Sequence, residues 1–91
     1  MPYEWEEWAI RALVDVEPHE VRQALAARRR WPRPAVGPLG TGVLTVWART
    51  VAGRPLVVAV YQVSGYTWRI VGARGMTDSE LAEFAQWEGT R

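Results

Sequence analysis

Three β-branched, apolar runs in the second half of the chain strongly limit how that half can fold. They span residues 43–50, 54–63 and 66–74, and only the short turns 51–53 and 64–65 separate them. Turns of this length join antiparallel neighbours, because a parallel connection needs a crossover of about a dozen residues or more. The runs therefore predict an antiparallel β-meander of three strands, with Ala35-Val36 as a short fourth strand at its edge.

Helical patterns lie on either side of this meander. Tryptophans and alanines of residues 3–14 recur at the spacing of one helical face, and a second helix is predicted from Pro18 to about Arg30. After the meander, Thr77-Asp78-Ser79-Glu80 has the form of a capping box, and the helix that it opens is predicted to end at Gly89.

The length and the order of these elements indicate the fold class. A chain of 91 residues has room for one hydrophobic core, so we expect one domain over residues 1–91. The predicted fold is α+β, with two N-terminal helices, a three- to four-stranded antiparallel β-meander and a C-terminal helix. Most tryptophans are predicted to be core residues, and Trp47 and Trp68 are placed to pair across the sheet.

Several classes of chemistry are excluded by the composition. The chain has no cysteine, which excludes disulfides, thiolate catalysis and cysteine metal sites. His19 is the only histidine, which excludes a two-histidine metal site or a two-histidine ribonuclease mechanism, and its place favours a surface position on the second helix. We expect no metal and no cofactor. The acidic start and the lack of an apolar run of about 20 residues favour the cytoplasm over the membrane.

The charges are strongly segregated along the chain, although the net charge is only +1. Residues 1–20 carry six acids and one arginine, residues 21–77 carry nine arginines and no acid, and residues 78–91 carry four acids and one arginine. The central arginines must therefore face a polyanion such as nucleic acid, face the acidic ends of the same chain, or remain solvated. The sequence leaves these three alternatives open.

The densest basic segment suggests contacts to RNA. Arg28, Arg29, Arg30 and Arg33 surround Trp31, a mixture that can hold phosphates and stack a single-stranded base. The alternative is that Arg28, Arg29 and Arg30 compensate the dipole at the end of the second helix while Trp31 anchors the loop to the core. Arg49 and Arg54 flank the first hairpin turn and extend the predicted phosphate-contacting rim.

Two further arginines belong to the last predicted strand. Arg69 and Arg74 are five residues apart, so the period of a strand sends them to opposite faces unless a bulge intervenes at Gly72. By parity, Arg74 shares a face with Trp68 and Ile70. One face must be covered by helices, and the other is free to remain open.

Four segments resemble the BrnT family, the small toxins of bacterial type II toxin–antitoxin pairs. The resemblance covers about residues 8–87 and is carried by the order of four segments: Val16-Glu17-Pro18-His19-Glu20-Val21, Val46-Trp47-Ala48-Arg49-Thr50, Gly53-Arg54-Pro55-Leu56-Val57-Val58, and Trp68-Arg69-Ile70-Val71-Gly72-Ala73-Arg74-Gly75-Met76-Thr77-Asp78-Ser79-Glu80. It implies a RelE-like sheet flanked by helices, a metal-independent ribonuclease that inhibits translation, and two partners: RNA and a DNA-binding antitoxin. On this hypothesis Arg74 and Arg69 contact the scissile phosphate in its transition state.

The chain departs from the family at two places. Leu13-Val14-Asp15 stands where members usually read Lys-His-Gly, and Phe84 stands where they have a tyrosine. Groups to take and return a proton are then reduced to Tyr61, Tyr66, His19 and the acids of the terminal helices. The competing hypothesis is a non-catalytic BrnT-like module that binds RNA or protein.

Overall fold

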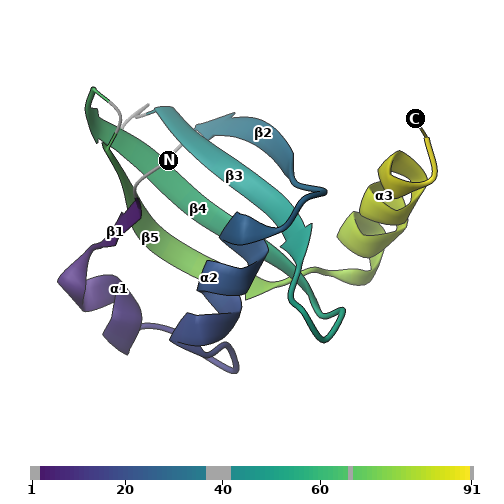
Figure 1. Cartoon of the computed structure of the whole chain (residues 1–91), viewed down its shortest axis with the longest axis horizontal. Helices are drawn as coiled ribbons and strands as arrows, with labels where there is room; N and C mark the ends of the chain where they lie inside the picture. The colour runs from purple at the N-terminus through teal and green to yellow at the C-terminus, as the bar shows by residue number, and fades with distance from the viewer. Residues whose placement is uncertain (1–2, 37–41, 66, 91) are drawn as a thin grey trace.

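The computed structural model describes residues 3–36, 42–65 and 67–90 and has an α+β fold built on a five-stranded mixed sheet (Figure 1). Its elements are, in chain order, β1 (Tyr3–Trp5), α1 (Glu7–Arg11), α2 (Pro18–Ala26), β2 (Trp31–Val36), β3 (Gly42–Arg49), β4 (Pro55–Ser64), β5 (Thr67–Gly75) and α3 (Asp78–Glu88). The strand order is β1-β5-β4-β3-β2. Residues 37–41, which follow the predicted edge strand, lie outside the described residues, as does Tyr66, which was expected in the third strand and as a candidate for proton transfer.

The predicted meander is confirmed, since β2, β3, β4 and β5 pair in sequence and antiparallel. The edge strand is longer than the predicted Ala35-Val36, because β2 begins at Trp31 and includes two prolines. Pro32 and Pro34 pair with Val46 and Leu44, and both lie on β2, which is an edge strand of the sheet that the described residues form. A proline is tolerated there because its missing N–H removes no bond from the sheet.

The predicted first helix is wrong at its start. Tyr3–Trp5 form β1, which pairs parallel to β5 with Tyr3 beside Trp68 and Trp5 beside Ile70. Only the five residues Glu7–Arg11 are helical. Tyr3 and Trp5 are two residues apart, so both side chains reach the same face of the sheet and pack against its core. Burial of two aromatic rings at an open sheet edge outweighs the helical pattern that includes Trp8.

One face of the sheet carries the main core. α2 begins with Pro18 at its first position, as predicted, and lies across this face (Figure 1). Its buried residues pack against the inward side chains of the central strands and against Ile70, forming one cluster that also contains Val16, two residues before the helix. The members of this cluster are Val16, Val21, Ala24, Leu25, Val46, Ala48, Leu56, Val58, Val60 and Ile70. All members of this cluster that are outside the strands lie in α2 or just before it, so this helix organises the main core.

The opposite face is covered at one end by α3. The capping box is confirmed: the backbone N–H of Glu80 donates to Thr77 Oγ1 over 3.2 Å, and the N–H of Thr77 donates to Glu80 Oε1 over 2.8 Å. Gly89 follows the last helical residue, as predicted. Phe84 is the buried residue of α3 and packs with Trp47 and Val57. The rest of this surface, from Thr45 across to Arg74, we call the open face.

A bulge in β5 decides which side chains reach the open face. Ala59 pairs with Gly72, but the next residue Val60 pairs with Ile70, so Val71 is the extra residue. The bulge restores a common parity: Arg69 lies beside Tyr61 and Arg74 beside Val57, both on the open face. The prediction that Arg74 shares a face with Trp68 and Ile70 is therefore wrong. The expected Trp47–Trp68 pair is wrong as well, because these rings lie on opposite faces.

Candidate functional site

Most of the arginines proposed for RNA contacts on the sheet are held by carboxylates of the two acidic ends. There are five such ion pairs; four of them join residues 34 to 63 positions apart, and Arg74 and Glu80 are six positions apart. They are Arg33 Nη1–Glu83 Oε2 (2.6 Å), Arg49 Nη2–Glu88 Oε1 (2.9 Å), Arg54 Nη1–Glu20 Oε1 (2.9 Å), Arg69 Nη1–Glu6 Oε1 (2.6 Å) and Arg74 Nη1–Glu80 Oε1 (2.6 Å). Of the three alternatives for the central arginines, pairing with the acidic ends is the one that holds for these five.

The open face is consequently not a cationic surface. Its ion pairs bring five carboxylates to four guanidinium groups, because Glu4 also lies 3.7 Å from Arg69. Exposed pairs of this kind contribute little to stability individually, but together they cancel the long-range attraction for a polyanion. The charge segregation of the sequence therefore becomes local neutrality on this side of the sheet.

Trp31 belongs to an aromatic cluster beneath α3. Its ring stacks on Trp87 at a centroid distance of 5.2 Å with planes 3° apart, and it meets the ring of Trp47 edge-on at 5.6 Å. The guanidinium of Arg33 lies 4.4 Å from the centroid of the Trp31 ring. Of the two interpretations of this residue, the geometry favours the anchor over a platform for a base.

Glu6, Tyr61 and Arg69 form a polar group at one end of the open face. Arg69 donates to Glu6 Oε1, and Tyr61 Oη donates to Glu6 Oε2 over 3.4 Å. Glu6 is placed by its own backbone N–H, which donates to the carbonyl of Ile70 over 3.1 Å. The hydrogen bond from Arg69 lowers the pKa of Glu6 and raises that of Arg69. The helical reading of residues 3–14 did not identify Glu6 as the partner of Arg69.

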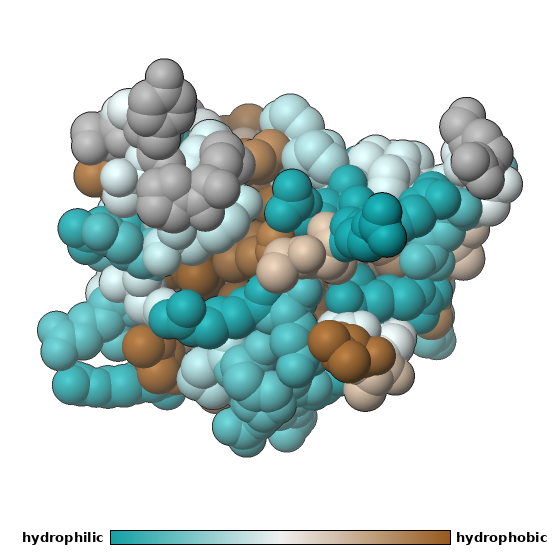
Figure 2. All heavy atoms as spheres, viewed as in Figure 1, coloured by the Kyte–Doolittle hydropathy of each residue, from teal (hydrophilic) through white to brown (hydrophobic). Residues whose placement is uncertain are grey.

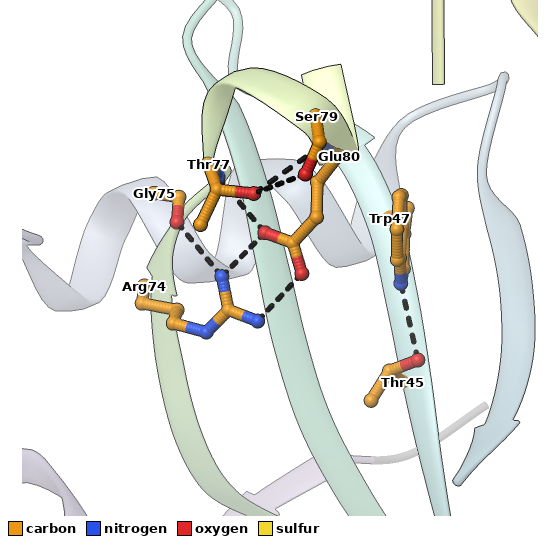
Figure 3. A network of polar contacts seen from close by, with 7 residues as sticks. All are labelled: Thr45, Trp47, Arg74, Gly75, Thr77, Ser79 and Glu80. Carbon is orange, nitrogen blue, oxygen red and sulfur yellow. Dashed lines mark hydrogen bonds and ion pairs between the residues drawn. The ribbon is translucent and has the colours of Figure 1, made fainter. Parts of the chain in front are cut away.

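Arg74 closes the other end of the open face through a two-pronged bond to Glu80 (Figure 3). Nη1 lies 2.6 Å from Oε1 and Nη2 lies 2.7 Å from Oε2, while Oε1 also accepts from the backbone of Thr77. These bonds, that from Arg74 above all, lower the pKa of Glu80 to about 2. Arg74 borders a shallow groove of about 280 Å³ with Ala59 and Gly72 among its lining residues.

A different set of arginines is free of carboxylates. Within the described residues, no ion pair is formed by Arg22, Arg28, Arg29 or Arg30, which we call the basic patch. All four are exposed. The last three were predicted to lie in the final turn of the second helix, but α2 ends at Ala26, so they lie in the connection to β2. Arg22 on α2 was not identified from the sequence as a candidate.

Two residues of the basic patch are held by backbone carbonyls instead. Arg30 Nη1 donates to the carbonyl of Leu25 over 2.5 Å, near the end of α2. Arg29 Nη2 donates to the carbonyl of Thr90 over 3.4 Å, and its guanidinium lies 4.9 Å from the ring centroid of Trp87. Carbonyl partners orient these guanidinium groups without neutralising their charge, so the patch keeps its full attraction for anions.

A cavity of about 330 Å³ opens beside the basic patch, between α2 and the edge of the sheet. It is lined by Tyr3, Trp5, Arg22, Leu25, Ala26, Arg30 and Ile70. Figure 2 shows a hollow beside α2 with apolar atoms at its bottom and hydrophilic side chains around it. The cavity depends on β1, which supplies both aromatic rings, so a helix over residues 3–14 does not predict it.

Among the described residues there is neither a cluster of metal ligands nor a helix suited to span a membrane. Within residues 3–36, 42–65 and 67–90, no group of three histidine, aspartate or glutamate side chains is arranged to hold a metal ion. None of the helices in that part of the chain is both long and apolar enough to cross a membrane. His19 is exposed in the first turn of α2. In sequence comparisons the chain matches no protein-family model and no curated protein.

Proposed function

We propose that this chain is an RNA-binding module that holds single-stranded RNA on the basic patch. The observation that carries the proposal is the division of the arginines: glutamates neutralise five on or beside the sheet, whereas Arg22, Arg28, Arg29 and Arg30 form no ion pair with any described residue. A phosphate backbone is drawn to unpaired cations and releases counterions when it binds them. The resemblance to BrnT toxins favours RNA as the polyanion and an antitoxin as a protein partner.

Binding is tested by fluorescence anisotropy with a labelled single-stranded RNA over a series of salt concentrations. Each phosphate contact that is lost should lower the salt slope by about 0.7. We expect Arg28→Gln and Arg29→Gln to weaken binding and reduce this slope. The matched control is Arg54→Gln, which removes the same charge from an arginine that already pairs with Glu20. An equal loss in the control would contradict the division of the arginines on which the proposal rests.

A second candidate is metal-independent RNA cleavage on the open face, as the BrnT resemblance implies. It is favoured by one observation, the bulge at Val71 that brings Arg69, Arg74 and Tyr61 to the same face beside Glu6. In such a reaction Glu6 takes the 2′-hydroxyl proton as that oxygen attacks phosphorus. Tyr61 gives a proton to the leaving 5′-oxygen as its bond to phosphorus breaks, and Arg69 stabilises the added negative charge.

Cleavage is tested by incubating a 5′-labelled RNA with the purified protein and a metal chelator. If this candidate holds, Glu6→Gln abolishes cleavage while RNA binding at the basic patch remains. The control is Glu83→Gln, which removes a carboxylate from an exposed pair away from Tyr61 and Arg69. Cleavage that persists in Glu6→Gln would overturn the assignment of the base. Binding without any cleavage would leave the binding module as the function.

A further inference from the structure

The cavity beside α2 combines three features that a nucleotide requires. Two aromatic rings, Tyr3 and Trp5, line it from β1, and its apolar lining includes Leu25 and Ile70. Two guanidinium groups, Arg22 and Arg30, belong to its lining as well and are free of carboxylates among the described residues. Aromatic rings stack bases of any sequence, and arginine binds phosphate with several donors at once.

We propose that this cavity binds a nucleoside monophosphate group, with the base against Trp5 and Tyr3 and the phosphate on Arg22 and Arg30. The group is either a free nucleotide or the 5′-phosphorylated end of an RNA chain. The second form rests on the proposed RNA-binding function and gives the basic patch a defined end at which the chain begins. The first form stands without it.

The backbone places these groups around one space. Tyr3 and Trp5 are alternate residues of β1 and pair with Trp68 and Ile70, so their rings share the α2 side of the sheet. On the helix, Arg22, Leu25 and Ala26 are three and four residues apart, the spacing of one helical face, and all three line the cavity. Arg30 completes the rim from the residue just before β2.

Arg30 is oriented before any ligand binds. Its Nη1 donates to the carbonyl of Leu25 at 2.5 Å, which uses one of its five N–H donors. The other donors remain for an anion. Because a carbonyl rather than a carboxylate holds it, the positive charge is not compensated, and Arg22 adds a second. Two guanidinium charges match a phosphate monoester, which carries close to two negative charges at neutral pH.

The size and the contrast with other cavities support the same ligand. A volume of about 330 Å³ lies at the lower end of the range for small-molecule sites, about 300–1,000 Å³, and suits one nucleotide. Another cavity in the described part, of about 300 Å³, is lined by Pro34, Ala35, Gly42, Val43, Leu44, Gln62 and Trp68, with no charged residue. The groove on the open face contains Arg74, whose guanidinium is already bound by Glu80.

The test is titration calorimetry of the full chain with AMP, adenosine, and inorganic phosphate. We expect AMP to bind at least tenfold more tightly than adenosine or phosphate alone. Trp5→Leu should weaken AMP binding about tenfold and leave phosphate binding unchanged, whereas Arg22→Gln should weaken both. The matched control is Trp8→Leu, because Trp8 is 57% exposed on α1 and is not among the lining residues.

Arg22 is the primary arginine variant. Arg30 also donates a hydrogen bond near the end of α2, so its substitution could disturb the helix, whereas Arg22 forms no ion pair in the described part of the chain. Equal affinity for AMP and phosphate, or AMP affinity unchanged by Arg22→Gln and Trp5→Leu, would overturn the proposal. Circular dichroism of each variant shows whether the fold is kept.

The two sources of the ligand are separated with a trinucleotide RNA carrying either a 5′-phosphate or a 5′-hydroxyl. A preference for the 5′-phosphate that Trp5→Leu removes supports recognition of an RNA end. Binding of AMP with no difference between the trinucleotides supports a free nucleotide. If RNA binding depends on Arg28 and Arg29 while AMP does not bind, this inference fails and the proposed function stands. If AMP binds and RNA does not, the free-nucleotide form of this inference stands and the proposed RNA-binding function fails.

Discussion

At the scale of single residues, the partner of each arginine decides what that arginine can do. Residues 21–77 contain nine arginines and no acid. The sequence could not predict the partners of Arg54 and Arg69, because these partners lie 34 and 63 residues away. Only the assembled sheet brings Glu20 and Glu6 to them. Arg28 belongs to the same stretch without acids, but it forms no ion pair within the described residues.

The cap of α3 gives a first prediction at this scale. Thr77→Ala removes the hydroxyl that accepts from the N–H of Glu80, and such caps contribute about 1 kcal/mol to stability. We expect the free energy of unfolding in urea to fall by about that amount. Gln86→Ala is the control, because Gln86 is an exposed residue of the same helix. An unchanged unfolding curve for Thr77→Ala would show that the cap does not stabilise the helix.

Glu80 gives a prediction about pH. Its pKa is lowered from 4.5 to about 2 in the folded chain, chiefly by Arg74, so its contribution is fully present above pH 4.5. The contribution is lost as pH falls from about 4.5 to about 2, because the unfolded chain binds the proton first. The side chain of Arg74 is 55% exposed, and screening by solvent limits the contribution of Glu80 to the free energy of unfolding to about 1–2 kcal/mol.

This acid sensitivity is measured by urea unfolding at pH 7 and pH 3. Glu80→Gln should lower stability at pH 7 and reduce the difference between the two pH values. Glu83→Gln is the matched control, because it removes a pair whose carboxylate side chain is 48% exposed, and such pairs contribute about 0–1 kcal/mol. The same pH dependence in Glu80→Gln as in the parent chain would contradict the role of the Arg74–Glu80 pair.

At the scale of elements, α3 and the four-stranded meander follow from local sequence signals, whereas β1 does not. Turn lengths specify antiparallel neighbours, and Thr77 and Gly89 mark the two ends of α3. β1 pairs with a strand more than sixty residues away, and its aromatic alternation, Tyr3 then Trp5, is only three residues long. A helical pattern over residues 3–14 competed with that signal, and the parallel contact to β5 decided the outcome.

Trp5 and Trp8 test this correction directly. A helix over residues 3–14 would bury both rings on one face, but Trp5 packs against the core and Trp8 is 57% exposed. We expect Trp5→Ala to lower the free energy of unfolding by about 2 kcal/mol, and Trp8→Ala to change it by less than about 0.5 kcal/mol. Chemical denaturation measures both. Equal losses would favour the continuous helix and would also remove the aromatic wall of the proposed nucleotide cavity.

At the scale of the whole molecule, the arginines fall into two groups. Glutamates from residues 1–20 and 78–91 neutralise the arginines on and beside the sheet, whereas Arg22, Arg28, Arg29 and Arg30 form no ion pair in the part of the chain that the structure describes. The charge segregation of the sequence left open whether the central arginines face a polyanion, the acidic ends or solvent, so it could not locate a positive surface. The location depends on where α2 ends and where α3 packs. The candidate site could therefore be predicted in its chemistry and only partly in its residues.

The most direct test of this division is a two-dimensional ¹H–¹⁵N NMR titration of the protein with a short single-stranded RNA. The account predicts the largest shift changes at Arg22, Arg28, Arg29 and Arg30 and small changes at Gly72 and Ala73, which lie between the two ion pairs of β5. Changes centred on Gly72 and Ala73, with the end of α2 unaffected, would contradict it and place the RNA on the open face.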